Sequence, residues 1–331
     1  MKTLFTGIQP TNDLTVGNYL SLKNFLKKQD DLKSLFCVVN LHAITLNHDP
    51  QTLREKVDRL FALYMAAGVD IEKSILFVQS DVPEHTELSW LLTCNSYMGE
   101  LNRMTQFKDK TAKINKGDQV SIPTGIYMYP ILMAADILLY DTHYVPVGAD
   151  QKQHVELARN IAERFNHKYG EIFVVPEPVI AKVDEGSKIL ALDDPSKKMS
   201  KSNENKFSKI GVNYTADEIK ASISKAVTDS DGVVRYAPEE KPGVSNLMVI
   251  YSKFSGLNIS EVEKKFQGVG YGVFKKELTA VIADELGELQ KKVNKIIASG
   301  EISRLRAGGA AAAREIAVPV LERAKRAMGI L

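Results

Sequence analysis

Leu35-Phe36-Cys37-Val38-Val39 is the stretch of this sequence that decides the fold class. An unbroken apolar run of this length predicts a strand that is buried on both faces, as the strands of parallel sheets are. A helical pattern over residues 51–67 follows and closes at Gly68, and Ile75-Leu76-Phe77-Val78 is the next apolar run. A strand, a helix and a second strand in this order form the repeating unit of a parallel sheet.

The same alternation continues on both sides of this unit. Leu4-Phe5 predicts an earlier strand, and residues 17–28 predict the helix that follows it. Downstream, Val145-Pro146-Val147-Gly148 predicts a strand end, and residues 150–165 predict another helix. We therefore expect an α/β fold class with a doubly wound, Rossmann-like parallel sheet, whose sites lie at the carboxyl ends of the strands.

The rest of the chain is predicted to be mostly helical. Residues 176–207 are rich in Pro, Asp, Lys and Ser, which favours a linker and a loop. Helical patterns follow over residues 216–227, 244–254, 260–266, 274–298 and 310–328. We expect a catalytic domain over residues 1–190 with a helical insertion at about 84–140, a linker and mobile loop over 191–208, and a helical C-terminal domain over 209–331, whose last helix could pack back on the catalytic domain.

The composition is typical of a globular enzyme, and it indicates no particular class of partner. A chain of 331 residues suits one large or two medium domains. Its apolar content of 44%, charged content of 25% and net charge of +2 are ordinary. Residues 1–190 hold 20 Lys and Arg against 23 Asp and Glu, whereas residues 191–331 hold 23 against 18. The C-terminal part is therefore mildly basic, as a surface that faces RNA would be.

The cysteines and the apolar runs bear on the compartment. Cys37 and Cys94 are far apart, which favours buried free thiols in a reducing environment. The first residues run directly into a turn and lack the pattern of a signal peptide. No apolar run approaches the ~18 residues that are needed to cross a bilayer. We expect a cytoplasmic protein with no membrane partner.

Thr15-Val16-Gly17-Asn18 is the first of two motifs that can carry chemistry. It opens the helix that follows the first predicted strand. Gly17 has no Cβ, so a nucleotide can approach the backbone closely, and the free N–H groups and dipole of a helix start favour phosphate oxygens. Thr15 and Asn18 can donate to those oxygens. The alternative is that this tetrapeptide is only a helix cap.

Lys198-Met199-Ser200-Lys201-Ser202 is the second motif, about 180 residues further on. Attack on the α-phosphate of ATP builds negative charge on the transferred group and on the departing pyrophosphate, and pre-positioned cations stabilise that charge. Lysines on a mobile loop bring the stabilising positive charge to the site when the loop closes. The fold must then bring both motifs together over one triphosphate. The alternative is a solvated basic loop.

Tyr129, Met133 and Asp136 form a third candidate group. Their spacing of i, i+4 and i+7 places them on one helix face. A carboxylate inside such an apolar run must find a partner, because burying it alone is very costly. An indole N–H, which only donates, is a suitable partner. The alternative is that Asp136 binds a neighbouring lysine or a backbone N–H.

The second motif is the signature of class I aminoacyl-tRNA synthetases, and Thr15–Asn18 resembles the His-Ile-Gly-His element of that class in its tryptophanyl form. The sequence resembles the bacterial-type tryptophanyl-tRNA synthetases along nearly its whole length, most densely over residues 104–110, 129–140, 145–154, 198–202 and 226–230. The resemblance implies ATP-dependent attachment of tryptophan to tRNA(Trp) through a tryptophanyl-adenylate, with release of AMP and pyrophosphate. It also implies ATP with Mg²⁺ as a substrate complex, no tightly bound cofactor, no protein-bound metal, a homodimer, and anticodon binding by the helical region over residues 209–331.

The same resemblance implies roles for individual residues. The implied catalytic residues are Lys198, Lys201, Lys110, Thr15 and Asn18. The implied ATP-binding residues are Gln9, Thr15, Gly17, Asn18, Gly148, Asp150, Gln151, Ile189, Lys198, Met199, Ser200, Lys201 and Ser202. The implied tryptophan-binding residues are Asp136, Phe5, Gln9, His42, Tyr129, Met133, Val145, Val147 and Gln151.

The sequence departs from the family pattern in places. Ala149 stands where most relatives have Glu, Asn40-Leu41 precedes His42 in place of Asp-Gln, and the stretch 116–121 is a few residues longer. Two rival functions therefore stay open. A tyrosyl-tRNA synthetase would share the fold but need a polar pocket for a phenol, which the Ala134-Ala135-Asp136 pattern disfavours. An inactive paralogue that binds RNA or tryptophan is disfavoured by the intact lysines of the second motif.

Overall fold

The computed structural model describes residues 1–11, 14–27, 31–105, 122–148, 151–180, 189–201 and 203–331. The chain divides into two compact units. The first unit comprises Met1–Thr11, Lys27–Ala181 and Ile296–Leu331, and the second comprises Asn12–Leu26 and Lys182–Lys295. The assignment of residues 1–190 to catalysis and of residues 209–331 to anticodon binding stays a prediction.

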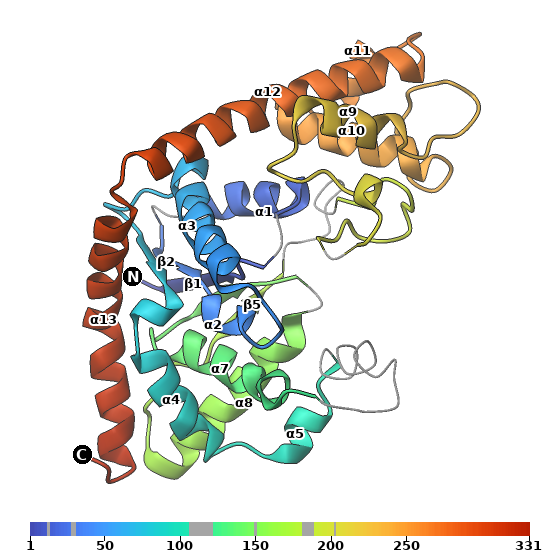
Figure 1. Cartoon of the computed structure of the whole chain (residues 1–331). Helices are drawn as coiled ribbons and strands as arrows, with labels where there is room; N and C mark the ends of the chain where they lie inside the picture. The colour runs from blue at the N-terminus through green and yellow to red at the C-terminus, as the bar shows by residue number, and fades with distance from the viewer. Residues whose placement is uncertain (12–13, 28–30, 106–121, 149–150, 181–188, 202) are drawn as a thin grey trace. The chain divides into compact units, whose positions relative to one another are not determined.

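A five-stranded parallel sheet is the centre of the first unit (Figure 1). Its strands are β1 (Thr3–Ile8), β2 (Lys33–Val38), β3 (Ile75–Val78), β4 (Tyr144–Pro146) and β5 (Glu177–Val179). The strand order is β3-β2-β1-β4-β5, and each neighbouring pair is parallel. The order reverses between β1 and β4, which is the switch point of a doubly wound sheet. The predicted fold class is confirmed.

Short turns and helices connect these strands. The helical elements of the first unit are α2 (Asn40–Ala43), α3 (Pro50–Ala67), the 3-10 helix η1 (Gln79–Asp81), α4 (Glu84–Thr93), α5 (Met98–Asn102), α7 (Thr124–Leu138), α8 (Lys152–Tyr169) and α13 (Ile302–Ala327). Helix α3 begins where the Asp49 carboxylate accepts the Thr52 N–H at 2.7 Å. It ends at Gly68, whose φ of 112° lies in the left-handed region that favours glycine. The predicted end of this helix is confirmed.

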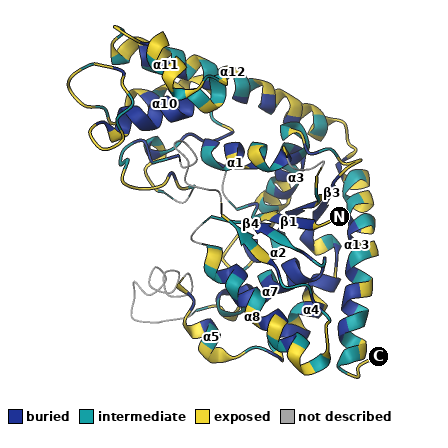
Figure 2. Cartoon of the chain, turned by 180° about the vertical axis from the view of Figure 1, so that it is seen from behind, coloured by how far each residue is buried: buried dark blue, intermediate teal, exposed yellow. Residues whose placement is uncertain are grey.

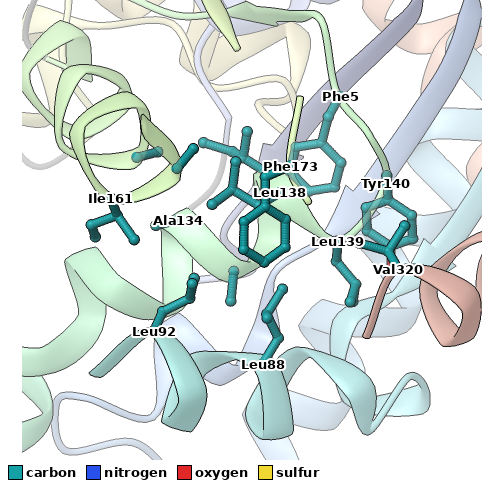
Figure 3. Packing of buried hydrophobic residues seen from close by; sticks show 14 of the residues in the cluster. Phe5, Leu88, Leu92, Ala134, Leu138, Leu139, Tyr140, Ile161, Phe173 and Val320 are labelled. Atoms are coloured by element: carbon teal, nitrogen blue, oxygen red, sulfur yellow. The ribbon is translucent and has the colours of Figure 1, made fainter. Parts of the chain in front are cut away.

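The core of the first unit gathers side chains of β1, α4, α7 and α8 (Figure 3). The ring of Phe5 stacks on that of Tyr140, with centroids 5.7 Å apart and 11° between the planes. Leu88, Leu138 and Ile161 are completely buried. Burying one such aliphatic side chain stabilises a fold by about 1.5–3 kcal/mol. This packing fixes α7, the helix that carries the third candidate group.

Helix α13 packs on β3 and on α4 (Figure 2). Its buried face includes the small residues Ala310, Ala313 and Ala317, together with larger ones such as Val320 and Leu321. At Gly309 the approach is closer still, because an added Cβ would lie 1.9 Å from the carbonyl oxygen of Leu76. Only a hydrogen atom fits between the helix and this strand at Gly309.

The second unit is almost entirely helical. Its elements are α1 (Val16–Leu26), the 3-10 helix η3 (Lys206–Ser208), α9 (Ala216–Ser224), α10 (Pro242–Ser255), α11 (Ile259–Lys265) and α12 (Tyr271–Ala298), the last as far as Lys295. Most of α10 is buried (Figure 2). The ring of Tyr251 in α10 meets that of Phe266 edge to face at 5.0 Å, and Phe266 meets Phe274 of α12 at 4.8 Å. These aromatic contacts hold the three helices together.

Two elements differ from the prediction. Strand β5 lies inside the stretch 176–207, which was expected to be a linker and loop; it has three residues, one of them Pro178, and proline is tolerated only at a sheet edge. Helix α13 begins at Ile302 and not at Ala310, because both glycines lie inside the helix and Gly309 is a packing site against β3 and not a helix start. Among the described helices, none is both long and apolar enough to cross a membrane.

The two neighbouring glycines of α13 give a matched test of this packing. An added Cβ at Gly308 meets nothing within 4 Å, so Gly308→Ala should leave the melting temperature unchanged or raise it, because alanine favours helix by about 0.8–1 kcal/mol. Gly309→Ala should lower the free energy of unfolding by about 1–3 kcal/mol, because the helix must move off β3. Chemical denaturation of both variants measures the difference. Equal stabilities would contradict the close contact.

Candidate active site

All predicted tryptophan-binding residues lie in the first unit, on or after strands of the sheet or on α7 and α8. Phe5, His42, Tyr129, Asp136 and Val145 are buried, and Gln9, Met133, Val147 and Gln151 are half-buried. Gln9 follows β1, and Val147 follows β4. The carboxyl ends of these two strands flank the switch point, where doubly wound sheets bind their ligands.

Asp136 is the centre of a buried hydrogen-bond network, with only 1% of its surface exposed. Its Oδ2 lies 2.7 Å from His42 Nε2. Its Oδ1 accepts the amide of Gln79 at 2.7 Å and lies 2.6 Å from His85 Nδ1. The partners are therefore two imidazoles and an amide, and not the lysine or backbone N–H of the alternative. A carboxylate has about four acceptor positions, so one further donor can still be accepted.

The network continues from His85 to Tyr140. The Tyr140 hydroxyl lies 2.7 Å from His85 Nε2. Because ionised Asp136 only accepts, His85 carries its proton on Nδ1 and uses Nε2 to accept the Tyr140 O–H. Burial raises the pKa of Tyr140, so this hydroxyl keeps its proton. The three side chains thus form a directed chain of donors that ends on the carboxylate.

The Asp136 carboxyl stays ionised. Burial alone would raise its pKa, but the charge and hydrogen bond of His42 and the hydrogen bond of His85 outweigh burial and hold the pKa well below its ordinary value. A charged acceptor is therefore present in the pocket at neutral pH. Such an acceptor binds a donor more strongly than a neutral oxygen does.

The departure at Asn40-Leu41 is part of the same network. The Leu41 N–H donates to Gln79 Oε1 at 2.9 Å. The Asn40 amide donates to Ser80 Oγ at 2.8 Å, and its Oδ1 accepts the Ser80 N–H at 3.1 Å. These bonds fasten η1 to α2, so that Gln79 and His42 keep a common position around the carboxylate.

The pocket face of α7 has a second polar contact. The Tyr129 hydroxyl lies 2.9 Å from His154 Nε2, and the ring of Tyr129 stands at 83° to that of His42, with centroids 6.1 Å apart. Burial raises the pKa of Tyr129, so its hydroxyl is a neutral donor or acceptor. Met133 lies between Tyr129 and Asp136 on this face, as predicted from the spacing.

Thr15 and Asn18 bind each other at the start of α1, in the second unit. The Thr15 hydroxyl and N–H donate to Asn18 Oδ1 at 3.0 Å and 3.1 Å. The Asn18 N–H returns a bond to Thr15 Oγ1 at 3.4 Å. The two residues therefore form the helix cap of the alternative interpretation. The cap leaves Asn18 Nδ2 available, because it bonds to no residue that the structure describes.

Lys198 and Met199 belong to a short hairpin. The Ala191 N–H donates to Lys197 O at 2.9 Å, and the Met199 N–H donates to Ile189 O at 3.0 Å. Alternation along the strand buries Met199 and exposes Lys198. The hairpin therefore anchors this motif through its methionine and presents the first lysine to solvent.

Ile189 joins the two motifs within the second unit. It pairs with Met199 in the hairpin, and an added Cβ at Gly17 would lie 3.5 Å from its own Cβ. Val16 is fixed to the same unit through its N–H, which donates to Ile210 O at 2.9 Å. The fold thus brings together the start of α1 and a hairpin that are far apart in the sequence.

Lys201 is half-buried, and burial lowers the pKa of its ammonium group. No carboxylate of a described residue is within ion-pair distance of it. Its backbone is held by Lys209, whose ammonium donates to Lys201 O at 2.8 Å and to Asn203 O at 2.9 Å. The loop is therefore fixed by one lysine while another keeps an unpaired positive charge.

Some predicted residues lie outside the part of the chain that the structure describes: Lys110, Asp150 and Ser202, together with the departures at Ala149 and 116–121. Within the described residues, no group of three or more His, Cys, Asp or Glu could hold a metal ion. Sequence reasoning missed Gln79 and His85. The available signal was their place in the sequence: Gln79 directly follows the apolar run of β3 and His85 lies at the start of the next helix, near the strand end where doubly wound sheets bind ligands.

Comparison with known proteins agrees with this geometry. Residues 1–287 match the family of tRNA synthetases class I (W and Y). The tryptophan–tRNA ligase of Caldanaerobacter subterraneus is 49% identical over 332 residues, which cover 100% of this chain and 99% of the relative. That of Bacillus subtilis is 47% identical over 330 residues, covering 99% and 98%.

Solved structures give the same result. The tryptophanyl-tRNA synthetase of Mycoplasma pneumoniae has a TM-score of 0.90 and 34% identity, covering 99% of this chain and 98% of its own. That of Campylobacter jejuni, complexed with ADP and tryptophan, has a TM-score of 0.84 and 33% identity, covering 99% and 100%. With this sheet, these two motifs and similarity from end to end, the chain belongs to the family of tRNA synthetases class I (W and Y).

Proposed function

We propose that this protein attaches tryptophan to tRNA(Trp) in an ATP-dependent reaction. The observation that carries the choice of amino acid is the similarity over the full length to tryptophan–tRNA ligases, within a family that has tryptophan and tyrosine branches. The ionised Asp136 carboxylate supports the same choice, because it can accept the indole N–H as its fourth hydrogen bond.

The reaction has two steps, and neither requires a nucleophile from the protein. First, a carboxylate oxygen of tryptophan attacks the α-phosphorus of ATP, the bond to pyrophosphate breaks, and tryptophanyl-adenylate forms. The 2′-hydroxyl of the terminal tRNA nucleotide then attacks the activated carbonyl carbon, and AMP leaves. Positioning and charge stabilisation supply the catalysis.

Residues of the second unit, together with Lys110, supply the implied phosphate contacts. We assign stabilisation of the departing pyrophosphate to Lys198, Lys201 and Lys110, and phosphate binding to the start of α1 with Asn18. Mg²⁺ enters with ATP as part of the substrate. Support for this assignment comes from the exposed Lys198, from the Lys201 ammonium, which pairs with no carboxylate in the described part of the chain, and from the position of Ile189 beside Gly17.

Amino-acid-dependent ATP–pyrophosphate exchange across the twenty amino acids tests the function. We expect exchange with tryptophan and little with any other. Exchange with tyrosine would favour the tyrosyl rival. A folded protein without any exchange would favour the paralogue that only binds its ligand.

We expect the charged Lys201 side chain to lower the stability of the fold while it is needed for activity. Because burial lowers its folded-state pKa, the charged form destabilises the fold below that pKa, and the penalty fades as pH rises towards the ordinary value. At pH 7, Lys201→Met should therefore leave the melting temperature unchanged or raise it, while exchange falls about 10²–10³-fold. Lys197→Met, in the same hairpin but exposed and paired with Asp194, is the control and should retain activity. A lower melting temperature in Lys201→Met would indicate a structural role.

Asp136→Asn should weaken recognition of the indole N–H more than binding of the ring. A useful probe is the benzothienyl isostere of tryptophan, in which sulfur replaces this N–H. The wild type should prefer tryptophan by about tenfold or more, since a hydrogen bond to a charged group contributes about 1.5–3 kcal/mol. In Asp136→Asn this ratio should approach one. Unchanged preference in a folded variant would refute the assignment.

The same variant has a pH signature. The folded-state pKa of Asp136 is lowered, so its stabilising contribution is present above the unfolded pKa of about 4 and is lost as pH falls towards the folded value. The difference in melting temperature between wild type and Asp136→Asn should therefore be largest near neutral pH and shrink in acid.

We further propose a homodimer that acts in the cytoplasm, where protein synthesis supplies tRNA. The helices α4 and α5 expose Trp90, Tyr97 and Met98 to 66%, 61% and 72%. Large apolar side chains on consecutive helices are typical of a surface that another chain covers. Met98→Glu should shift sedimentation from dimer to monomer, whereas Val273→Glu on α12, also exposed, should not. A wild-type monomer would refute the proposal.

The tRNA is proposed to contact the helical part beyond residue 209. Its support is the basic excess of residues 191–331, with 23 Lys and Arg against 18 Asp and Glu. The proposal rests on how charge is distributed along the chain and not on the net charge, which is only +2.

A further inference from the structure

Helix α13 carries cationic side chains that bind segments next to the Asp136 network. Arg306 binds η1, Arg314 and Lys325 bind α4, and Arg323 binds the turn after α7. All these contacts lie within the first unit. None of these cations bonds to Asp136 itself; each binds a residue on a neighbouring segment.

Arg306 fixes η1 from one side. Its Nε and Nη2 donate to the two oxygens of Asp81 at 3.0 Å and 2.9 Å, and its Nη1 donates to Asp58 of α3 at 2.9 Å. A bidentate pair of this kind sets direction as well as distance. Asp81 is the last residue of η1, and the first is Gln79, which donates to Asp136.

Arg314 fixes the start of α4. Its Nε and Nη2 lie 2.9 Å and 2.8 Å from Glu84 Oε1. Glu84 is buried, and its other oxygen has no hydrogen-bond partner among the described residues. Arg314 therefore supplies the main compensation for a buried charge, directly before His85, the second donor to Asp136.

Arg323 fixes the turn that follows Tyr140. It donates to Asp141 Oδ1 at 2.6 Å and to Ile172 O at 2.7 Å. Asp141 has a φ of 47°, which is unusual for a residue other than glycine and needs support from its surroundings. The ion pair thus holds the strained residue next to the one that donates to His85.

We propose that α13 positions the donors of the Asp136 network, and that Arg306 and Arg314 are positioning residues for the choice of amino acid. Helix α13 is seated against β3 by the Gly309 contact, and its arginines hold the segment 79–85 at Asp81 and Glu84, near its two ends. Gln79 and His85 occupy these ends and supply two of the three bonds to the carboxylate. The inference rests on the proposed function, because it concerns recognition of the indole N–H.

The two carboxylates of Arg306 provide a matched pair of variants. Asp81→Asn and Asp58→Asn each weaken one ion pair with the same arginine and keep the side-chain shape, but only Asp81 belongs to the segment 79–85. The measurement is the ratio of kcat/KM in pyrophosphate exchange for tryptophan and its benzothienyl isostere. We expect Asp81→Asn to lower this ratio about fivefold or more, through a higher KM for tryptophan, and Asp58→Asn to leave it unchanged.

Arg314 gives a second measurement. Arg314→Gln should lower the same ratio, and Arg314→Lys should restore part of it, since lysine can still pair with Glu84. Arg304→Gln is the control, because Arg304 lies on the same helix, is exposed and pairs with Glu301 at the start of that helix. If Arg314→Gln does not fold, the Asp81 and Asp58 pair still decides the question.

The measurements distinguish a failure of the proposed function from a failure of the inference about α13. A wild type without tryptophan exchange would overturn the proposed function and this inference with it. A wild type that prefers tryptophan over the isostere, with the same preference in Asp81→Asn as in Asp58→Asn, would overturn the inference alone. Losses of stability and of kcat that are equal for both substrates would show that α13 only stabilises the fold.

Discussion

A buried negative charge organises the proposed amino-acid site of this protein. Asp136 has 1% of its surface exposed, and a carboxylate at that depth is tolerated only when several donors replace its water. The donors come from α2, η1 and α4, three elements that follow β2 and β3 directly in the chain. The carboxyl ends of those strands therefore cannot move independently, because each must keep its donor on one carboxylate.

The sequence alone predicts the parts of this arrangement that are local. The apolar runs predict β2 and β3, and the spacing of Tyr129, Met133 and Asp136 predicts one face of α7, all of which the structure has. Gln79 and His85 were not predicted, because a bond between residues 57 or 51 positions apart depends on tertiary packing and leaves no periodic signal. Strand β5 was missed for a related reason: three residues at an edge contribute too little pattern.

In the second unit the two motifs could be recognised from the sequence, but the electrostatic state of one of their lysines could not. Thr15 and Asn18 bond to each other, so their side chains already serve the helix start. Lys201, in contrast, is half-buried with a lowered pKa, which is an unfavourable state for a cation that has no counter-charge among the described residues. A group that destabilises the free protein in this way gains most when an anion arrives, so the binding energy of a triphosphate can be directed to that position.

The arginines of α13 fix, from outside, the segment that supplies two of the donors to the buried carboxylate. Apolar contacts seat this helix, but they have no direction, and they cannot by themselves fix the orientation of an amide or an imidazole on another element. Arginine forks have direction, because both N–H vectors must meet their oxygens. Where a helix of small residues lies against β3 and its arginines reach Asp81 and Glu84, the position of two donors to Asp136 is set by bonds that lie outside the pocket. Because the donors are fixed from outside, the Asp136 carboxylate can keep one orientation while the side chains around the proposed indole ring stay apolar.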